Sequence, residues 1–359
     1  MNRPAVPTYV TDAGNFTDCP PGHRFNLYFP IWGDAWKLDK NGKAAALREC
    51  LKLGDAAPPL KALLARQQTL ADALPEDRRY IIDARSTAPF ATGLGLEHPV
   101  ENGFAFLSPY GLPYLAGSGV KGVLRRAAEE LRDDGDTDLS PVVIDALFGP
   151  EDTDDARRGA LTCWDMFPKP AKDSLVVEIM TPHFNHYLQD GGTPHDAGKP
   201  IPIPFLAVPA GSEFRFVITC EPALLPADIG DWKAVIDKII THAFDWLGFG
   251  AKTSVGYGAM DRLSAEEVAV ARAESKQAAL RCEWVDAKIR EIADKRNKNG
   301  EEDALRGERL AKEWAALADA ELKKRALTDI RARWEVQGWW AAPPKGTARK
   351  AKVIYEEGA

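Results

Sequence analysis

Two segments of the chain carry hydrophobic side chains at helical spacing. In residues 118–132 and again in residues 231–247 they recur three and four positions apart. Such spacing places one apolar stripe along a helix, and that stripe must be covered by other elements. Asp231 at the start of the second segment and Gly248 just after it are typical of helix ends. The pattern therefore predicts two amphipathic helices.

Strands are predicted around these helices by runs rich in β-branched and aromatic residues. The order along the chain is strand, helix, several strands, helix, strand, which predicts an α+β, ferredoxin-like (RRM-like) core over residues 79–263. Such a core is an antiparallel sheet with two helices on one face. The predicted strands are residues 79–90, 160–166, 174–180, 201–208, 212–220 and 259–263.

The segments on either side of this core differ from it. Residues 1–78 are first rich in Pro and Gly and then helical in two pieces broken at Pro58 and Pro59, so we expect an irregular and helical N-terminal region packed on the core. Residues 264–359 are rich in Ala, Glu, Lys and Arg, with a break at 297–303. They predict a C-terminal helical hairpin and a tail. Its five tryptophans predict docking onto a neighbouring protein or onto the body of this chain.

Charge and apolar content limit the class of protein. No run of about 18 apolar residues is present and the first residues lack an apolar leader, so we expect a cytoplasmic protein without a membrane partner. The net charge is −7; residues 264–359 hold 20 Lys and Arg against 18 Asp and Glu, so the remaining residues hold 26 against 35. Any nucleic acid must therefore be held by local basic patches and not by the overall field.

The cysteines predict neither a disulfide framework nor a metal centre. They are odd in number, far apart and without a CxxC pair, which favours reduced thiols, no metal and no cofactor. They are Cys19, Cys50, Cys163, Cys220 and Cys282.

The junction GLPYLAGSGVKGVLRR (111–126) is the first candidate for chemistry. Three glycines bracket a lysine where a loop turns into the first predicted helix, and free backbone N–H groups beside a lysine can bind an anion. The GxxxxGK[ST] spacing of a nucleotide-binding loop is absent. A tight connection with solvated basic side chains is the alternative. The candidate RNA contacts are Gly117, Ser118, Gly119, Lys121, Gly122, Arg125 and Arg126.

The junction LGFGAKTSVGYG (247–258) is the second candidate. Its four glycines allow close approach of a backbone, its Lys, Thr and Ser can donate hydrogen bonds to phosphates, and its Tyr can stack on a base. The alternative is a flexible turn after a helix. We expect both junctions to lie on one side of the sheet and to form one RNA groove. The candidate contacts here are Gly248, Gly250, Lys252, Thr253, Ser254, Gly256 and Tyr257.

The segment TPHFNHY (181–187) is the third candidate. His183 and His186 stand three positions apart with His195 nearby, which suits a metal site or general acid–base catalysis. The carboxylate or cysteine that would complete a metal site is missing at ligand spacing, so we predict no metal. Stacking of His183, His186 and Tyr187 against RNA bases suits the segment better. Packed, hydrogen-bonded histidines are the alternative.

Four pieces of the sequence, in order along residues 79–263, resemble the RAMP superfamily and, within it, the sixth-subunit family of the Cmr complex, the type III-B CRISPR effector. The Gly-rich last piece is typical of RAMP proteins generally, and the second and third are typical of that subunit family. The pieces are ARSTAPFATGLGLEHP, YGLPYLAGSGVKGVLRR, TPHFNHY with PIPIPFLAV, and GFGAKTSVGYG.

The resemblance implies an RRM-like fold that caps one end of a filament of backbone RAMP subunits and has no catalytic residue. Its implied partners are the 3′-proximal crRNA, the paired target RNA, the backbone RAMP subunit and a neighbouring RAMP subunit. It also implies a projecting loop that wedges the guide–target duplex, for which residues 181–200 are the best candidate. Two positions depart from the family: Gly119 replaces a frequent Ser, and Phe184 a frequent Tyr.

Two other functions are compatible with the same residues. One is a metal-independent RAMP-type RNA endonuclease, in which His183 or His186 is the base and Lys252 stabilises the transition state. The net negative charge disfavours such an enzyme acting alone. The other is a protein-only scaffold whose glycine-rich loops are turns.

Overall fold

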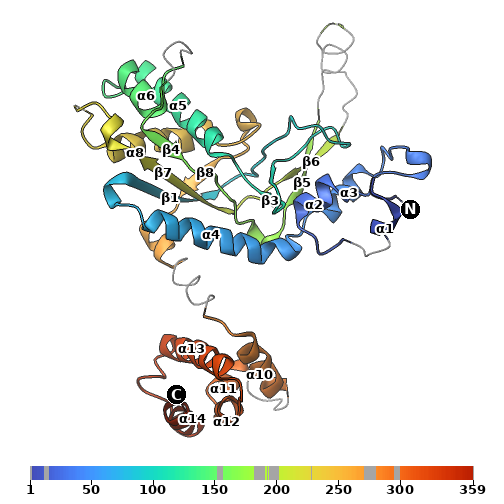
Figure 1. Cartoon of the computed structure of the whole chain (residues 1–359), viewed down its shortest axis with the longest axis vertical. Coiled ribbons are helices and arrows are strands. Elements are labelled where there is room, and N and C mark those ends of the chain that lie inside the picture. Colours follow the sequence, from blue (N-terminus) through green and yellow to red (C-terminus); the bar gives the residue numbers. More distant parts are fainter. Residues whose placement is uncertain are drawn as a thin grey trace. The chain divides into compact units, whose positions relative to one another are not determined.

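The computed structural model describes residues 2–11, 16–151, 157–181, 191, 193, 202–227, 229–270, 280–294 and 300–358. The chain divides into two compact units, residues 1–263 and residues 264–359 (Figure 1). No helix in these ranges is long and apolar enough to cross a membrane.

The N-terminal unit is built on a four-stranded antiparallel sheet with the strand order β4-β7-β1-β8. The two central strands are paired from Arg79 with Thr219 to Arg85 with Glu213. The edge strands β4 and β8 are short. The strands are β1 (Arg79–Ser86), β4 (Leu161–Cys163), β7 (Glu213–Cys220) and β8 (Met260–Arg262).

Helices α5 (Gly117–Asp133) and α8 (Trp232–His242) cover one face of this sheet, and α8 continues into a π-helical turn, Ala243–Leu247. Successive strand residues point to opposite faces, so alternate side chains of β1 and β7 meet the apolar stripes of both helices. Burial of each large side chain there contributes roughly 1.5–3 kcal/mol. The predicted amphipathic helices are confirmed. The buried residues at this interface include Ile82, Ala84, Leu124, Phe214, Phe216, Ile218, Ile236 and Ile240.

Helix α4 (Ala57–Asp72) lies on the opposite face of the sheet. Arg215 stands between two inward-facing phenylalanines of β7, so its side chain points away from α5 and α8. Its guanidinium donates to the Gln68 side chain of α4 and, at 2.6 Å, to Asp83 on β1. In Figure 1, α5 and α8 lie together on one side of the strands and α4 on the other. The face of the sheet without α5 and α8 is therefore partly covered.

The remaining parts of this unit surround the sheet. Two of the predicted strands form a separate antiparallel pair, because their residues pair with each other. The N-terminal helices contribute buried side chains such as Phe25 and Leu47 to the same core as the sheet. These elements are α1 (Thr8–Thr11), α2 (Pro21–Asn26), α3 (Lys43–Glu49), β2 (Phe106–Leu107), β3 (Leu112–Pro113), α6 (Pro141–Phe148), β5 (Val176–Met180) and β6 (Ile203–Ala207).

The C-terminal unit differs from the predicted helical hairpin. From Glu283 onward the described residues form five helices, because the chain starts a new helix after Gly300, after Gly307 and at the Asp319 N-cap. The predicted tail contains the last of these helices. The helices are α10 (Glu283–Asp294), α11 (Glu301–Leu305), α12 (Glu308–Ala315), α13 (Ala320–Val336) and α14 (Thr347–Glu357).

The tryptophans of this unit form its own core, so their predicted docking elsewhere is wrong. Trp314 and Trp334 are 1% and 0% exposed, and both rings pack edge-on against Tyr355. Their indole N–H groups donate to the carbonyls of Lys323 at 2.8 Å and Leu305 at 3.2 Å. Short helices are marginal alone, and shared burial of these rings stabilises them together. The other members of the cluster include Trp284, Trp339 and Trp340.

Candidate functional site

Both glycine-rich junctions lie at the same end of the sheet. β1 and β4 are each antiparallel to β7, so their C-terminal ends point the same way. Gly117 begins α5 at that end, where its N–H donates to Asp165 at 2.7 Å. β8 runs opposite to β1, so residues 248–258 before it lie at this end too, and the Ala251 N–H donates to the Ala91 carbonyl at 2.7 Å. The junctions adjoin the two edge strands.

The start of α5 is packed tightly against β4. A Cβ at Gly117 would lie 2.1 Å from the carbonyl oxygen of Cys163, so glycine is needed there for close approach. The Lys121 amine donates to the carbonyl of Leu161 at 2.9 Å. Burial lowers the pKa of Lys121. This lysine is therefore already bound within the protein.

The two arginines of α5 have different surroundings. Arg125, whose side chain is 18% exposed, lies 2.9 Å from Glu129 and 3.2 Å from Asp145 of α6, and also donates to the Gly149 carbonyl. Its guanidinium joins α5 to α6 and is occupied. Arg126 is 64% exposed and pairs with Glu130 on the same helix at 2.9 Å. Arg126 is thus the arginine that a partner can reach.

The two ends of residues 248–258 are packed closely against neighbouring backbone. A Cβ at Gly250 would lie 2.3 Å from the Ala91 carbonyl oxygen, and one at Gly258 would lie 1.8 Å from that of Phe249. Both glycines have positive φ, which other residues adopt at a cost. Phe249 is fully buried in the main core.

The polar side chains of this turn differ in whether they are free to bind a ligand. Lys252 has a left-handed backbone, and its amine makes no hydrogen bond or ion pair with any residue that the structure describes. Ser254 is exposed. The Tyr257 hydroxyl donates to Glu178 of β5 at 3.0 Å. Burial, with that hydrogen bond, raises the pKa of Tyr257 to about 12. Tyr257 holds the turn to β5, which disfavours base stacking.

The third candidate segment falls outside the described residues. His183, His186, Tyr187 and His195 are among those that the structure leaves out, as is most of 181–200. Within the described ranges no three His, Cys, Asp or Glu side chains are placed to hold a metal ion. The five cysteines are free thiols, and burial raises the pKa of Cys50 to about 12.

One exposed aromatic residue was missed by sequence reasoning. Trp246, in the π-helical turn beside residues 248–258, is 78% exposed. The available signal was its position off the apolar stripe of an otherwise regular amphipathic segment.

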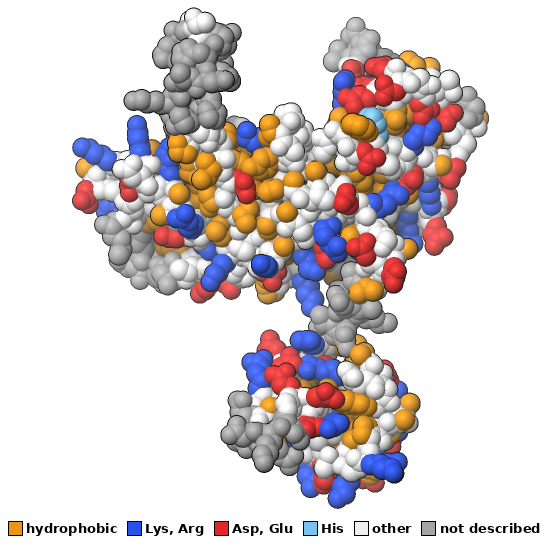
Figure 2. Space-filling view, turned by 180° about the vertical axis from the view of Figure 1, so that it is seen from behind, with side chains coloured by type: hydrophobic (Ala, Val, Ile, Leu, Met, Phe, Trp, Pro, Cys, Tyr) orange, Lys and Arg blue, Asp and Glu red, His pale blue; other side chains and the backbone are white. Residues whose placement is uncertain are grey.

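The surface charge of the N-terminal unit is mixed. On the face shown in Figure 2, hydrophobic side chains gather near the centre, and Lys and Arg alternate with Asp and Glu around them. A long-range attraction for nucleic acid is not expected from such a surface, so binding there depends on local groups.

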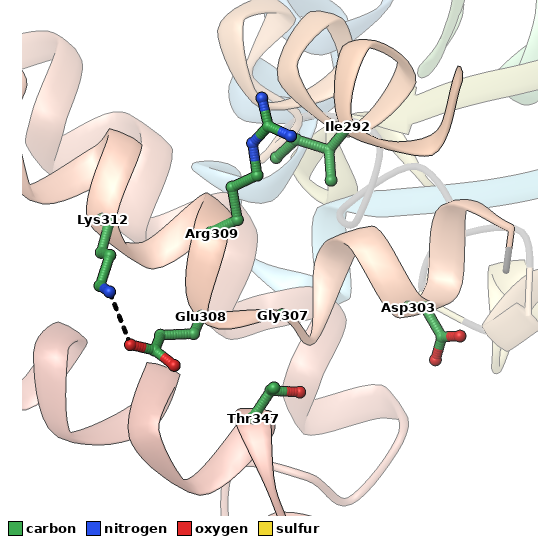
Figure 3. A pocket seen from close by; sticks show the side chains of 7 residues that line it. All are labelled: Ile292, Asp303, Gly307, Glu308, Arg309, Lys312 and Thr347. Carbon is green, nitrogen blue, oxygen red and sulfur yellow. Dashed lines mark ion pairs between the residues drawn. The ribbon is translucent and has the colours of Figure 1, made fainter. Parts of the chain in front are cut away.

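An open cavity of about 270 Å³ lies in the C-terminal unit, between the ends of its helices. Figure 3 shows Lys312 and Glu308 facing each other across its rim, with their charged atoms 2.7 Å apart. Asp303 pairs with Arg306. Three of the four charged side chains that line the cavity are therefore paired within the unit. It is lined by Ile292, Asp303, Gly307, Glu308, Arg309, Lys312 and Thr347.

Comparison with known proteins relates the N-terminal unit to one family. The model of the RAMP superfamily matches residues 83–261. The CRISPR system Cmr subunit Cmr6 of Pyrococcus furiosus is 28% identical over an alignment that covers 48% of this chain and 65% of that protein. The Cmr6 subunit of Saccharolobus solfataricus is also 28% identical, covering 44% and 47%. The chain thus spans less than two thirds of the length of these relatives.

Similar chains occur among solved structures. The crystal structure of Cmr6 from Pyrococcus furiosus is 25% identical and covers 53% of this chain and 100% of that one, with a TM-score of 0.32. A chain of the type III-B Cmr-beta complex bound to cognate target RNA is 22% identical and covers 63% and 71%, with a TM-score of 0.46.

Proposed function

Because this chain belongs to the RAMP superfamily, we propose that it is a non-catalytic subunit of a type III-B CRISPR (Cmr) ribonucleoprotein. In this role it caps the backbone filament and binds the 3′-proximal crRNA and the paired target RNA. Its protein neighbours are the backbone RAMP subunit and a second RAMP subunit. The two curated relatives described as Cmr6 subunits support this assignment.

We assign the sheet of the N-terminal unit to the ferredoxin-like class. In chain order its strands are β1, β4, β7 and β8, with α5 after the first and α8 after the third. Their spatial order is β4-β7-β1-β8, with every neighbouring pair antiparallel. This arrangement supports a βαββαβ core with both helices on one face.

The observation that carries the RNA-binding role is that both glycine-rich junctions share one end of the sheet. RRM modules stack bases on the face of the sheet that their helices leave open. Here α4 partly covers that face, and Arg215 is held by Gln68 and Asp83. The end of the sheet where both glycine-rich junctions lie, here called the loop end, offers the unpaired amine of Lys252 and the exposed side chains of Ser118 and Ser254. RNA bound by these groups would be held mainly through its phosphates.

Co-purification tests this function. The chain is isolated with its particle from its host, and the bound RNA is extracted, end-labelled and sequenced. We expect a ladder of small RNAs with repeat-derived 5′ ends and ultraviolet crosslinks to peptides containing residues 117–122 or 248–258. Recovery of the particle without crosslinked RNA on this chain would favour the protein-only scaffold.

The same preparation tests the absence of catalysis. Incubation with labelled repeat RNA in EDTA should give no discrete products. Discrete cleavage that is abolished by His183→Ala or His186→Ala would instead establish the endonuclease.

A further inference from the structure

Trp246 is an exposed aromatic ring on a rigid support. It lies in the π-helical turn Ala243–Leu247, and 78% of it is exposed. Its neighbours in the turn, Ala243 and Phe244, are buried in the main core and fix the backbone. The indole has no ring, hydrogen-bond or ion-pair partner in the portion of the chain that the structure covers. π-Helical turns occur often at functional sites, and an aromatic ring held open on one has a free face for a partner.

Helix α5 lies beside the π-helical turn that carries this ring. α5 begins at the loop end of the sheet and α8 ends there, so the two helices run in opposite directions. α5 packs against the π-helical turn. One turn before Trp246, the His242 ring lies 3.0 Å from Glu130. Because the two helices are antiparallel, one turn earlier on α5 corresponds to one turn later after His242. The exposed Arg126, one turn before Glu130, is therefore at the level of Trp246 along the helix axis.

The exposed face of α5 near Arg126 carries few side-chain atoms. Ser118, Gly122 and Arg126 follow one another at four-residue intervals and are all exposed. Nothing lies within 4 Å of the position that a Cβ of Gly122 would take. A glycine inside a helix lowers its stability relative to alanine, and packing does not require one here. What the glycine does allow is close approach of another molecule's backbone.

We propose that Trp246 is a base-stacking platform for single-stranded RNA, and that the adjoining phosphate lies over Gly122 between Ser118 and Arg126. This site rests on the proposed function, because it requires RNA at the loop end of the sheet. A base can stack on the free face of the indole whatever its identity. The Ser118 hydroxyl and the Arg126 guanidinium donate hydrogen bonds to phosphate oxygens.

The surroundings favour RNA over a protein as the partner. Protein hot spots are dry, and near-neutral contacts that exclude water surround them. Around Trp246 the accessible groups of α5 are instead a hydroxyl, a bare backbone and a guanidinium. The carboxylate of Glu130 on α5 is engaged by both Arg126 and His242. The unpaired amine of Lys252 follows six residues later.

The test compares Trp246→Ala and Trp246→Phe in the full chain, with Trp36→Ala as a control. Trp36 is also exposed, at 52%, but Arg3 lies over its ring. Affinity for a fluorescently labelled single-stranded RNA is measured by anisotropy over a salt series. We expect Trp246→Ala to weaken binding about 5- to 100-fold at every salt concentration, because stacking does not depend on counterion release. Trp246→Phe should restore most of the affinity, and Trp36→Ala should bind as the unmodified chain does.

A second variant tests the phosphate position. Gly122→Leu fills the open space above α5 and should weaken RNA binding without lowering the melting temperature. Unchanged RNA affinity in Trp246→Ala overturns the stacking site, as does normal RNA binding with failed assembly onto a protein neighbour. If the unmodified chain and its particle bind no RNA at all, the proposed function itself fails. If RNA binding is weakened by Lys252→Ala but not by Trp246→Ala, the proposed RNA-binding function stands and the stacking site at Trp246 is wrong.

Discussion

Lys121 and Lys252 carry the same charge at the same end of the sheet, but their surroundings differ. Lys121 donates to the Leu161 carbonyl and is half-buried. Lys252 has no partner in the described chain. A free amine can neutralise a phosphate, whereas a bound one must first break its hydrogen bond. The contribution of each lysine to RNA binding is therefore expected to differ.

Replacement of each lysine by alanine measures this difference. Lys252→Ala should lower the dependence of log K on log salt by about 0.7 for single-stranded RNA, and it should leave the free energy of unfolding unchanged. Lys121→Ala should destabilise the fold by about 1 kcal/mol, because the Leu161 carbonyl loses its donor. Salt-dependent RNA binding and urea unfolding of both variants check this. An equal loss of salt dependence in both would show that Lys121 leaves its carbonyl to bind RNA.

Gly256 and Gly258 form a matched pair for the packing of the loop. Both have positive φ, but a Cβ would enter open space at Gly256 and would lie 1.8 Å from a carbonyl oxygen at Gly258. Gly256→Ala should cost about 1–2 kcal/mol from backbone strain alone. Gly258→Ala should cost more than about 3 kcal/mol, because the turn must also move. Equal costs in urea unfolding would mean that the turn is looser than the structure shows.

Between elements, Arg125 and Arg126 have opposite roles. Arg125 links α5 to α6 through Asp145 and the Gly149 carbonyl. Arg125→Met should therefore lower the free energy of unfolding by about 1.5–3 kcal/mol and leave RNA affinity unchanged. Arg126→Met removes an exposed pair within one helix and should cost at most about 0.5 kcal/mol. Thermal unfolding and RNA titration separate the two. A stable Arg125→Met variant with weakened RNA binding would reverse these assignments.

At the scale of the whole molecule, the two units have separate cores. The C-terminal core contains buried residues from Cys282 to Tyr355 and none from residues 1–263 among those described. Truncation after Leu263 should therefore leave the N-terminal unit folded, with its melting temperature and both glycine-rich junctions retained. Calorimetry and two-dimensional NMR of residues 1–263 and of the full chain provide the check. Aggregation of the truncated chain would show that the C-terminal unit covers part of the N-terminal unit.

Trp314 provides the complementary test on the C-terminal unit. It is 1% exposed and contacts Tyr355, so Trp314→Ala should cost that unit about 3–5 kcal/mol. The unit is small and its helices are short, so this loss should unfold it. The transition of the N-terminal unit should be unchanged in the full chain. Loss of both transitions together would contradict independent cores.

The sequence by itself determined the elements of the N-terminal unit. Apolar periodicity is a local property, so residues 118–132 and 231–247 predicted α5 and α8 with its π-helical turn, and the strand runs predicted β1, β4, β7 and β8. Glycine clusters likewise marked two junctions whose backbones approach a neighbouring carbonyl closely. Resemblance to the RAMP superfamily along the same residues is confirmed by the match to residues 83–261.

Only the tertiary structure decided which side chains remain available, because that depends on residues far away in the chain. Tyr257 is bound by Glu178, 79 positions earlier, and Lys121 by a carbonyl 40 positions later. Contacts between distant residues also divide the six predicted strands between two sheets. They likewise bring the tryptophans of the C-terminal unit together in one core. Local patterns fix which face of an element is apolar; the partner that covers that face is fixed only when the chain folds.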